Sequence, residues 1–160
     1  MSPQAGAPQL QPAPLEMADL LGCWSLVEAL EDRGGVIRNN PNYGAKPTGF
    51  LHYLAEGRVS VAVANGGREP MSGTNRRMAP VEQLAESART FDAYAGRFSL
   101  IAPDHVAHHI EISTYQNDVG KDLVRRVLLE GDRLALHIPV FEESGQTVRR
   151  WLAWQRLTGA

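Results

Sequence analysis

The sequence predicts a mainly β fold in which eight antiparallel strands close into a barrel with a ligand cavity, and one helix (about residues 80–95) is inserted between the third and fourth strands. Three observations lead to this prediction. Short segments of alternating apolar and polar residues recur along the chain, separated by turns rich in glycine, asparagine and aspartate. Only one segment has the apolar period of a longer helix. Strands and helices do not alternate, which argues against a parallel sheet.

The composition is that of one ordinary globular domain. The chain has 160 residues, of which 43% are apolar and 21% charged, so a core can form without disulfides or metals. We divide it into a disordered tail over residues 1–15, rich in proline, glutamine and alanine, and a barrel domain over residues 16–160. Residues 16–21 form one helical turn at most, which can close one end of the barrel.

Charge and apolar patterning exclude several classes of partner. The net charge is −2 and no Lys/Arg block occurs, which argues against nucleic acid. No segment approaches the ~20 apolar residues of a membrane helix. The first residues lack the pattern of a signal peptide, and Cys23 has no partner for an internal disulfide, so we expect a cytoplasmic protein. A small-molecule ligand is the expected partner, and a homodimer stays open.

The first three strands are expected at residues 23–31, 50–54 and 59–64, with a tight hairpin around Gly57 between the last two. In the third strand the valines share one face. The other face carries only small side chains, which leaves room for a helix or a ligand: Ser60, Ala62 and Ala64.

The expected helix begins at Pro80 and runs to Tyr94, with Gly96 ending it. Its apolar residues form one stripe that we expect to pack on the sheet: Val81, Leu84, Ala88 and Phe91. A long loop over residues 65–79 precedes it. The remaining strands are expected at residues 97–101, 106–115, 122–129, 133–138 and 146–157.

Several segments resemble a known family. Gly22-Cys23-Trp24 at the start of the first strand resembles the lipocalin signature, and residues 151–156 resemble the closing strand whose arginine caps that tryptophan. Six ordered segments over roughly residues 20–158 are similar to the bacterial and fungal lipocalin-like domain family of intracellular β-barrels. The resemblance implies natural-product biosynthesis as a setting, without fixing one activity. Extracellular retinoid transport does not follow, since the chain lacks the disulfide of the secreted lipocalins.

The segment 106–115 carries the candidate catalytic pair, His109 and Glu111. Two residues apart in a strand, they project from one side about 6.5 to 7 Å apart, and in a partly dry cavity they would serve as acid and base. Alternation alone leaves two interpretations open: this face lines the cavity, or it meets solvent while Ile110 and Ile112 face inward. The family resemblance implies that the His-x-Glu pair faces the interior.

Other residues are candidates for binding the substrate: Tyr53, Ser60, Tyr94, Ser113 and Arg126. Arg126 shares its strand face with Val124 and Leu128, which favours an inward position, where it would orient a carboxylate or enolate. The opposite face, with Arg125, is flanked by apolar residues as well, so alternation does not decide between the two arginines.

Two further predictions concern structure and metals. Arg156 is expected to stack on Trp24 in a structural role, through packing and cation–π attraction. Cys23 is interpreted as a small apolar filler. No metal site is predicted, because His108 and His109 point to opposite faces and no zinc-type spacing occurs.

These observations support two main hypotheses. In the first, the barrel binds a small, largely apolar biosynthetic intermediate and catalyses an isomerisation or cyclisation without a cofactor, as an isomerase, cyclase or lyase-type enzyme. In the second, the same cavity serves a non-catalytic carrier or sensor. A barrel filled by its own side chains is the third alternative.

Overall fold

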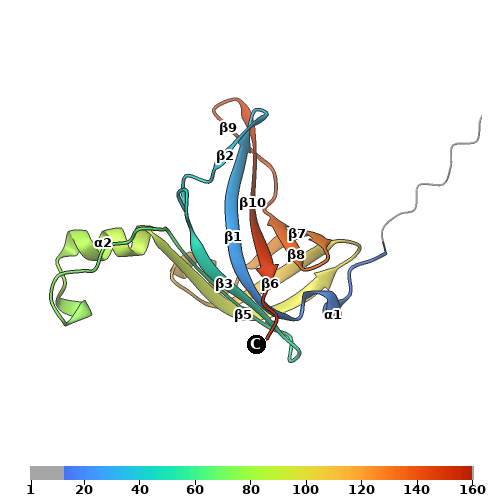
Figure 1. Ribbon diagram of the computed structural model, residues 1–160, viewed down its shortest axis with the longest axis horizontal. Helices are drawn as coiled ribbons and strands as arrows, with labels where there is room; N and C mark the ends of the chain where they lie inside the picture. The colour runs from blue at the N-terminus through green and yellow to red at the C-terminus, as the bar shows by residue number, and fades with distance from the viewer. Residues whose placement is uncertain (1–12, 160) are drawn as a thin grey trace, which may run out of the picture.

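The computed structural model describes residues 13–159, which form a closed antiparallel barrel with two extended hairpins and one projecting arm (Figure 1). The elements in chain order are α1 (Met17–Leu20), β1 (Gly22–Arg33), β2 (Val36–Asn39), β3 (Thr48–Leu54), β4 (Arg58–Ala64), a 3-10 turn (Arg76–Met78), α2 (Val81–Arg89), β5 (Phe91–Ile101), β6 (His105–Ser113), a 3-10 turn (Gln116–Asp118), β7 (Asp122–Glu130), β8 (Arg133–His137), β9 (Phe141–Glu143) and β10 (Gln146–Arg156).

Eight strands make the barrel. They follow one another in the order β1-β3-β4-β5-β6-β7-β8-β10, and antiparallel pairing of β10 with β1 closes the ring. The predicted mainly β, eight-stranded antiparallel barrel is therefore confirmed. The short strands β2 and β9 were not predicted; each pairs with the extended outer part of its neighbour, β1 or β10, beyond the closed barrel (Figure 1).

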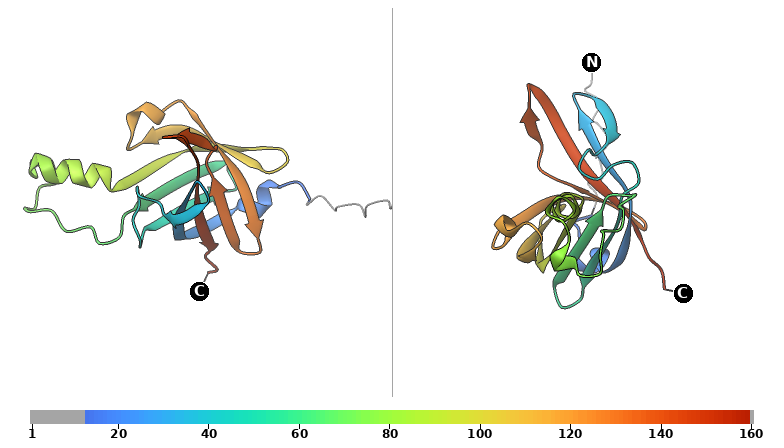
Figure 2. Two further views of the ribbon diagram at one scale, coloured as in Figure 1. Left: turned by 90° about the horizontal axis from the view of Figure 1, so that it is seen from above. Right: turned by 90° about the vertical axis from the view of Figure 1, so that its left-hand side faces the viewer.

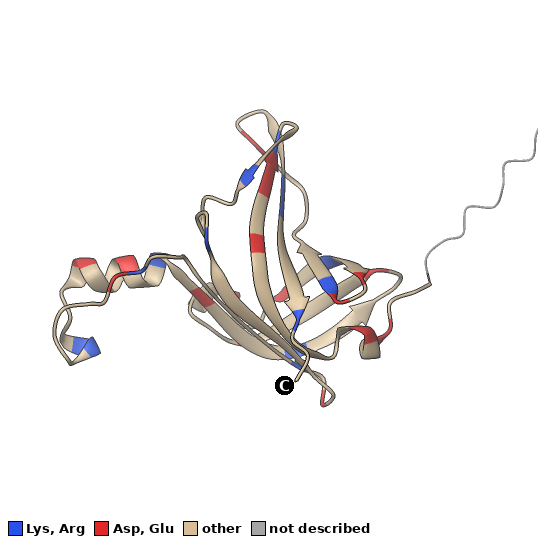
Figure 3. Cartoon of the chain, in the orientation of Figure 1, with Lys and Arg blue, Asp and Glu red and all other residues tan. Residues whose placement is uncertain are grey.

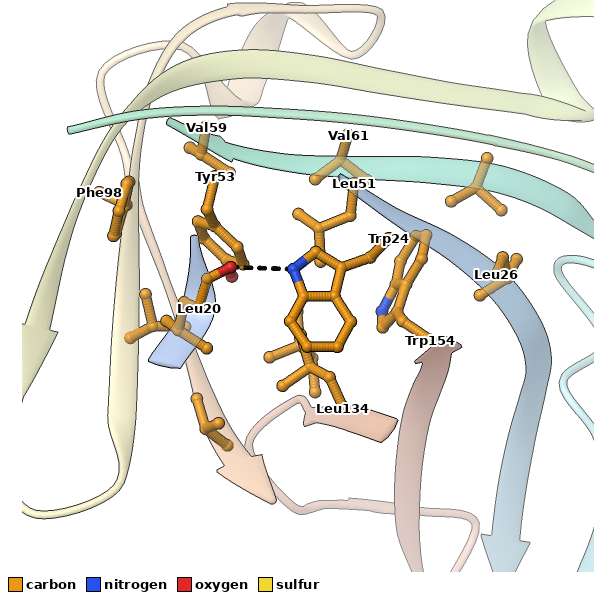
Figure 4. Packing of buried hydrophobic residues seen from close by; sticks show 14 residues of the cluster. Leu20, Trp24, Leu26, Leu51, Tyr53, Val59, Val61, Phe98, Leu134 and Trp154 are labelled. Atoms are coloured by element: carbon orange, nitrogen blue, oxygen red, sulfur yellow. Dashed lines mark hydrogen bonds between the residues drawn. The ribbon is translucent and has the colours of Figure 1, made fainter. Parts of the chain in front are cut away.

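One end of the barrel is closed by α1. Leu20 is fully buried, and its carbonyl accepts a hydrogen bond of 2.9 Å from the indole Nε1 of Trp24 (Figure 4). On the outer side the guanidinium of Arg156 lies 4.1 Å from the centre of the Trp24 ring, the stacking that the sequence predicts. Gly22 fits this junction because its φ is +130° and a Cβ there would lie 3.2 Å from Arg156.

The helix differs from its prediction. It does lie between the third and fourth barrel strands, β4 and β5, but it covers Val81–Arg89 instead of residues 80–95, and residues 91–94 already belong to β5. The apolar stripe does not pack on the sheet: no α2 residue is buried, and Val81 is 75% exposed. In the left view of Figure 2 the helix and its preceding loop extend away from the barrel as an arm.

The prediction that Gly96 ends the helix is wrong, because Gly96 lies within β5. The β5–β6 register shifts between Ala95 and Gly96, which leaves Glu111 as the extra residue of a bulge. A Cβ on Gly96 would come within 1.9 Å of the His109 carbonyl oxygen, so only glycine fits this close approach of two backbones.

The inner face of β4 is the valine face. Val59, Val61 and Val63 are buried in the core, whereas the small residues of the strand are half-exposed on the outer side. The expectation that the small face leaves room for a ligand is therefore wrong. Branched apolar residues of β4 line the interior, as is usual where one face of a sheet must be dry.

The surface of the barrel carries mixed charge, and the described start of the chain packs against the barrel. Basic and acidic side chains are interspersed over the barrel and its hairpins (Figure 3). No helix among residues 13–159 is long and apolar enough to cross a membrane. Most of the predicted tail, residues 1–12, lies outside the described residues, but Leu15 packs against the core and its N–H donates to the Pro103 carbonyl.

Candidate functional site

The barrel encloses a cavity of about 140 Å³ in the half away from α1. Its walls come from strands on opposite sides of the barrel and from the loop after β2. The apolar part of the lining consists of Val61, Val63, Leu136, Ile138, Trp151, Leu152 and Trp154. The polar part consists of Asn40, Asn42, Tyr43, Asp92, Tyr94, Arg125 and Arg150. An apolar pocket with a few converging polar groups is typical of small-molecule sites.

A chain of three hydrogen-bonded rings connects this cavity to the core. His108 on β6 is fully buried, with its Nδ1 2.8 Å from the Tyr94 hydroxyl and its Nε2 2.7 Å from the Tyr53 hydroxyl. Tyr94 lines the cavity, and Tyr53 lies deeper, packed edge-on against Phe98. The two bonds satisfy both imidazole nitrogens in a dry environment, which explains how this polar ring is accommodated in the core.

Burial sets the protonation of these rings. Desolvation lowers the pKa of His108 to about 3, with help from the charge of Arg125, so the imidazole is neutral near pH 7. Desolvation raises the pKa of Tyr94 to about 12, although Arg125 opposes this shift, and raises the pKa of Tyr53 well above its usual value. All three rings are therefore uncharged in the folded protein.

Two cations line the cavity, Arg125 and Arg150, and Arg150 is paired with Glu31. The Nη1 of Arg125 donates to the Val124 carbonyl at 3.0 Å, and no carboxylate of the described residues lies within 4 Å of its guanidinium. Arg126, the residue that the sequence favoured, is exposed and pairs with Asp104 on the outer surface. That prediction is wrong because Val124 and Leu128, which flank Arg126, themselves lie on the outer face, with Leu128 45% exposed.

The mouth and wall of the cavity carry two further polar features. Tyr43 donates a hydrogen bond of 2.8 Å to Asp92, and desolvation together with this carboxylate raises the pKa of the phenol. Trp154 is 1% exposed, and its Nε1–H has no acceptor among the described residues. A buried donor without a partner is uncommon in proteins.

The predicted catalytic pair does not line the cavity. Glu111 is exposed and bridges Arg58 and Arg97, at 2.6 and 3.1 Å. His109 lies on the same outer face, where its Nδ1 is 2.6 Å from Asp122 and its Nε2 is 2.8 Å from Ser99. The prediction of an inward His-x-Glu pair is wrong, because the more apolar face with Val106, His108 and Ile110 fills the core.

The other predicted ligand contacts divide in the same way. Tyr53 and Tyr94 do point into the barrel and meet through His108. Ser60 is on the outer side of β4, next to His52. Ser113 pairs with Tyr94 in the strand register, but its hydroxyl accepts the N–H of Tyr115 and it does not line the cavity.

Sequence reasoning did not place His108 or Trp154 in the candidate site, and it left Arg125 undecided against Arg126. A signal for His108 was available, since it alternates with Val106 and Ile110 and a histidine between apolar neighbours on one strand face indicates burial. For Arg125 the apolar neighbours Leu123 and Val127 gave the same signal as those of Arg126, so the pattern did not distinguish the two arginines. Within residues 13–159 no group of three or more histidine, cysteine or acidic side chains is arranged to hold a metal ion.

Within the β1–β2 hairpin, a buried carboxylate supports the cavity wall. Glu31 is fully enclosed and accepts hydrogen bonds from Arg33 at 3.1 Å, Arg38 at 2.7 Å and Arg150 at 2.6 Å. Burial alone would raise its pKa, but the bonds from the three arginines outweigh burial and lower the pKa to about 2. Arg150 also lines the cavity, so this cluster holds one of its polar walls in place.

Comparison with known families agrees with this architecture. The family described as "Lipocalin-like domain" matches residues 21–157, which include every barrel strand. The chain belongs to this lipocalin-like domain family. Its fold is thus a lipocalin-like barrel of the kind that binds small molecules.

Two individual proteins are similar to it. One is the 4'-hydroxy-3'-methoxypropiophenone carrier protein ppsC of Aspergillus oryzae, 35% identical over 101 residues, which are 57% of this chain and 84% of the relative. The other is a solved structure of bovine odorant binding protein in complex with a selenium-containing odorant, with 13% identity and a TM-score of 0.43. That similarity covers 95% of this chain and 79% of the bovine chain.

Proposed function

We propose that this lipocalin-like barrel is a carrier that takes one small, largely apolar biosynthetic intermediate into the cavity at the end away from α1. The observation that carries the proposal is the cavity itself, which is lined mainly by apolar and aromatic side chains and by a few inward polar groups. The fungal relative, whose name describes it as a carrier of an aromatic ketone, supports both the role and an aromatic ligand.

The size of the cavity sets the size of the ligand. An engineered protein cavity of about 150 Å³ binds benzene, and the cavity here measures about 140 Å³. One aromatic ring would therefore fill the enclosed part. Any larger substituent would extend toward the mouth, near Tyr43 and Asp92.

The proposal predicts that filling the cavity abolishes binding. Val61 points inward and lines the cavity, so Val61→Phe places a ring where the ligand would lie. Titration calorimetry with 4'-hydroxy-3'-methoxypropiophenone should give a dissociation constant below about 1 mM for the native chain. For Val61→Phe the affinity should fall at least about tenfold, the effect of losing a buried site.

The matched control is Ala62→Phe on the same strand. Ala62 is half-exposed on the outer face, so this variant adds the same ring outside the barrel and should bind as the native chain does. Circular dichroism would verify that both variants are folded. Equal binding by all three proteins would refute the cavity as the binding site.

A cofactor-free isomerase or cyclase is the second candidate, and the ring chain of Tyr94, His108 and Tyr53 favours it. The Tyr94 hydroxyl, held by His108, can donate a hydrogen bond to the carbonyl oxygen of a bound ketone and so stabilise the negative charge that develops on that oxygen when an α-proton is removed. The proposed pair of His109 and Glu111 no longer supports this activity, because both lie outside the barrel.

Hydrogen exchange separates the two candidates. In D₂O, an enzyme that enolises the bound ketone would accelerate the loss of its α-protons, followed by proton NMR, and His108→Gln would remove the acceleration. The carrier proposal predicts the same exchange rate with and without the native protein. A clear acceleration by the native chain, absent in the variant, would replace the carrier by the enzyme.

A further inference from the structure

We infer that the cavity selects a neutral ligand that carries a carbonyl oxygen, and that Tyr94 and Arg125 donate the hydrogen bonds that recognise it. This inference rests on the proposed function and names its ligand chemistry. It follows from the direction of the hydrogen bonds in the ring chain and from donors that have no acceptor in the described part of the protein.

The most deeply buried ring, Tyr53, sets the donor-to-acceptor direction of the hydrogen bonds among the three rings. Tyr53 is 1% exposed, and its hydroxyl has one partner among the described side chains, Nε2 of His108. A neutral imidazole has one N–H and one bare nitrogen. If Nε2 carried the hydrogen, the Tyr53 hydroxyl would be a buried donor without an acceptor, which is unfavourable. The favoured tautomer therefore accepts at Nε2 and carries its hydrogen on Nδ1.

The same tautomer makes Tyr94 a donor toward the cavity. Since Nδ1–H donates to the Tyr94 oxygen, the hydroxyl hydrogen of Tyr94 is free for another acceptor. Tyr94 lines the cavity, so that acceptor belongs to whatever occupies it. The buried rings thus fix which hydrogen-bonding group Tyr94 presents, although only Tyr94 among them reaches the cavity lining.

Arg125 is a second donor that lines the same space. The Nε1–H of Trp154 is not counted as a donor to the ligand, because this nitrogen is buried without an acceptor in the described structure and lies beside Trp24 (Figure 4). Arg125 keeps guanidinium N–H groups beyond the one that binds the Val124 carbonyl. Two acceptors of the lining are engaged locally, since Asp92 accepts from Tyr43 and Asn40 accepts from the Asn42 N–H.

The electrostatics favour a neutral acceptor over an anion. Burial holds the pKa of Tyr94 at about 12 even though Arg125 favours the phenolate. An anionic ligand at the same depth would meet the same desolvation, whereas a carbonyl accepts the same hydrogen bonds without a charge to bury. A ketone or another uncharged carbonyl compound is therefore the class that fits.

The tautomer can be tested without any ligand. Nitrogen-15 NMR of the histidine-labelled native protein should show His108 neutral at pH 7, with the hydrogen on Nδ1. His108→Gln identifies its signal by removing it. A His108 that carries its hydrogen on Nε2 would overturn the inference, whether or not the protein binds an aromatic compound.

Three probes of one shape test the ligand chemistry: acetophenone, α-methylstyrene, in which CH₂ replaces the oxygen, and benzoate, which is charged. Calorimetry should show that Tyr94→Phe weakens acetophenone binding by about tenfold and leaves α-methylstyrene within about twofold. Benzoate should bind the native chain more weakly than acetophenone. Equal losses for ketone and alkene, or tighter binding of benzoate, would overturn the inference.

Adjacent arginines provide a matched pair for the second donor. Arg125→Leu should weaken acetophenone binding by about tenfold, whereas Arg126→Leu, on the outer face, should leave it unchanged. If the native chain binds α-methylstyrene but shows no dependence on Arg125 or Tyr94, the cavity is a binding site and the donor set is wrong. If the native protein binds none of the probes, the proposal of an aromatic ligand is refuted. The NMR result still decides the direction of the hydrogen bonds among Tyr53, His108 and Tyr94.

Discussion

Glu31→Ala is expected to lower the free energy of unfolding by about 3 kcal/mol, the lower end of the cost of removing one partner from a buried ion cluster. Glu31 is fully enclosed and receives bonds from Arg33, Arg38 and Arg150. Without the carboxylate, three guanidinium groups remain close together with no negative charge between them. Urea unfolding at pH 7, followed by tryptophan fluorescence, measures the loss.

The same residue contributes to acid stability. Because the folded pKa of Glu31 is lowered from 4.5 to about 2, the unfolded state takes up a proton before the folded state does. The stabilisation is therefore fully present above about pH 4.5 and is lost as the pH falls toward 2. In Glu31→Ala this part of the pH dependence should be absent.

Glu28→Ala is the control on the same strand. Glu28 pairs with Arg133 at 2.8 Å, but both side chains are largely exposed, so its loss should cost less than about 1 kcal/mol. An equal effect of the two substitutions would mean that Glu31 acts as an ordinary surface residue. Arg33 also bonds Glu143 on β9, which connects the cluster to both extended hairpins.

The barrel was predictable because its signals are local. Turn residues such as Gly57 and Gly131, both with positive φ, separate segments of strand length, and eight such segments with short connections favour closure. The junction of Trp24 and Arg156 was predictable for a similar reason, since the two residues mark the strands that close the barrel. Neither inference required knowledge of which strand face is inside.

The site was less predictable because it depends on that choice of face. On β7 apolar residues occur on both sides of the strand, so alternation could not separate Arg125 from Arg126. On β6 the outward residues Glu111 and His109 form ion pairs and hydrogen bonds with neighbouring strands, and such partners are not visible in one strand's pattern. Helix α2 shows the same limit, because an apolar stripe does not reveal whether anything packs against it.

His108 leads to the second large effect, a loss of stability in mild acid. The pKa of this buried imidazole is lowered from 6.5 to about 3, so below pH 6.5 the unfolded chain binds a proton that the folded chain does not. Stability should therefore decrease as the pH falls from 6.5, by roughly 2 to 3 kcal/mol at pH 4.5, since each unit corresponds to about 1.4 kcal/mol.

The window between pH 6.5 and 4.5 isolates this histidine from Glu31, whose contribution changes only at lower pH. Urea unfolding across the window should show the decrease in the native chain and its near-disappearance in His108→Gln. His137 also has a lowered pKa and contributes in the same direction, but it is only partly buried. Native-like pH dependence in His108→Gln, with its loss in His137→Gln, would assign the effect to His137.

The His108→Gln variant should also be less stable at neutral pH, by about 2 kcal/mol, because two buried tyrosine hydroxyls lose a well-placed partner. Tyr53→Phe removes one of those hydroxyls and keeps the imidazole, so the acid decrease should persist in it. If the acid decrease in stability persists in Tyr53→Phe and is lost in His108→Gln, its cause is the lowered pKa of the His108 imidazole. The ring chain that we expect to orient Tyr94 toward a ligand would then also limit the stability of the barrel in acid.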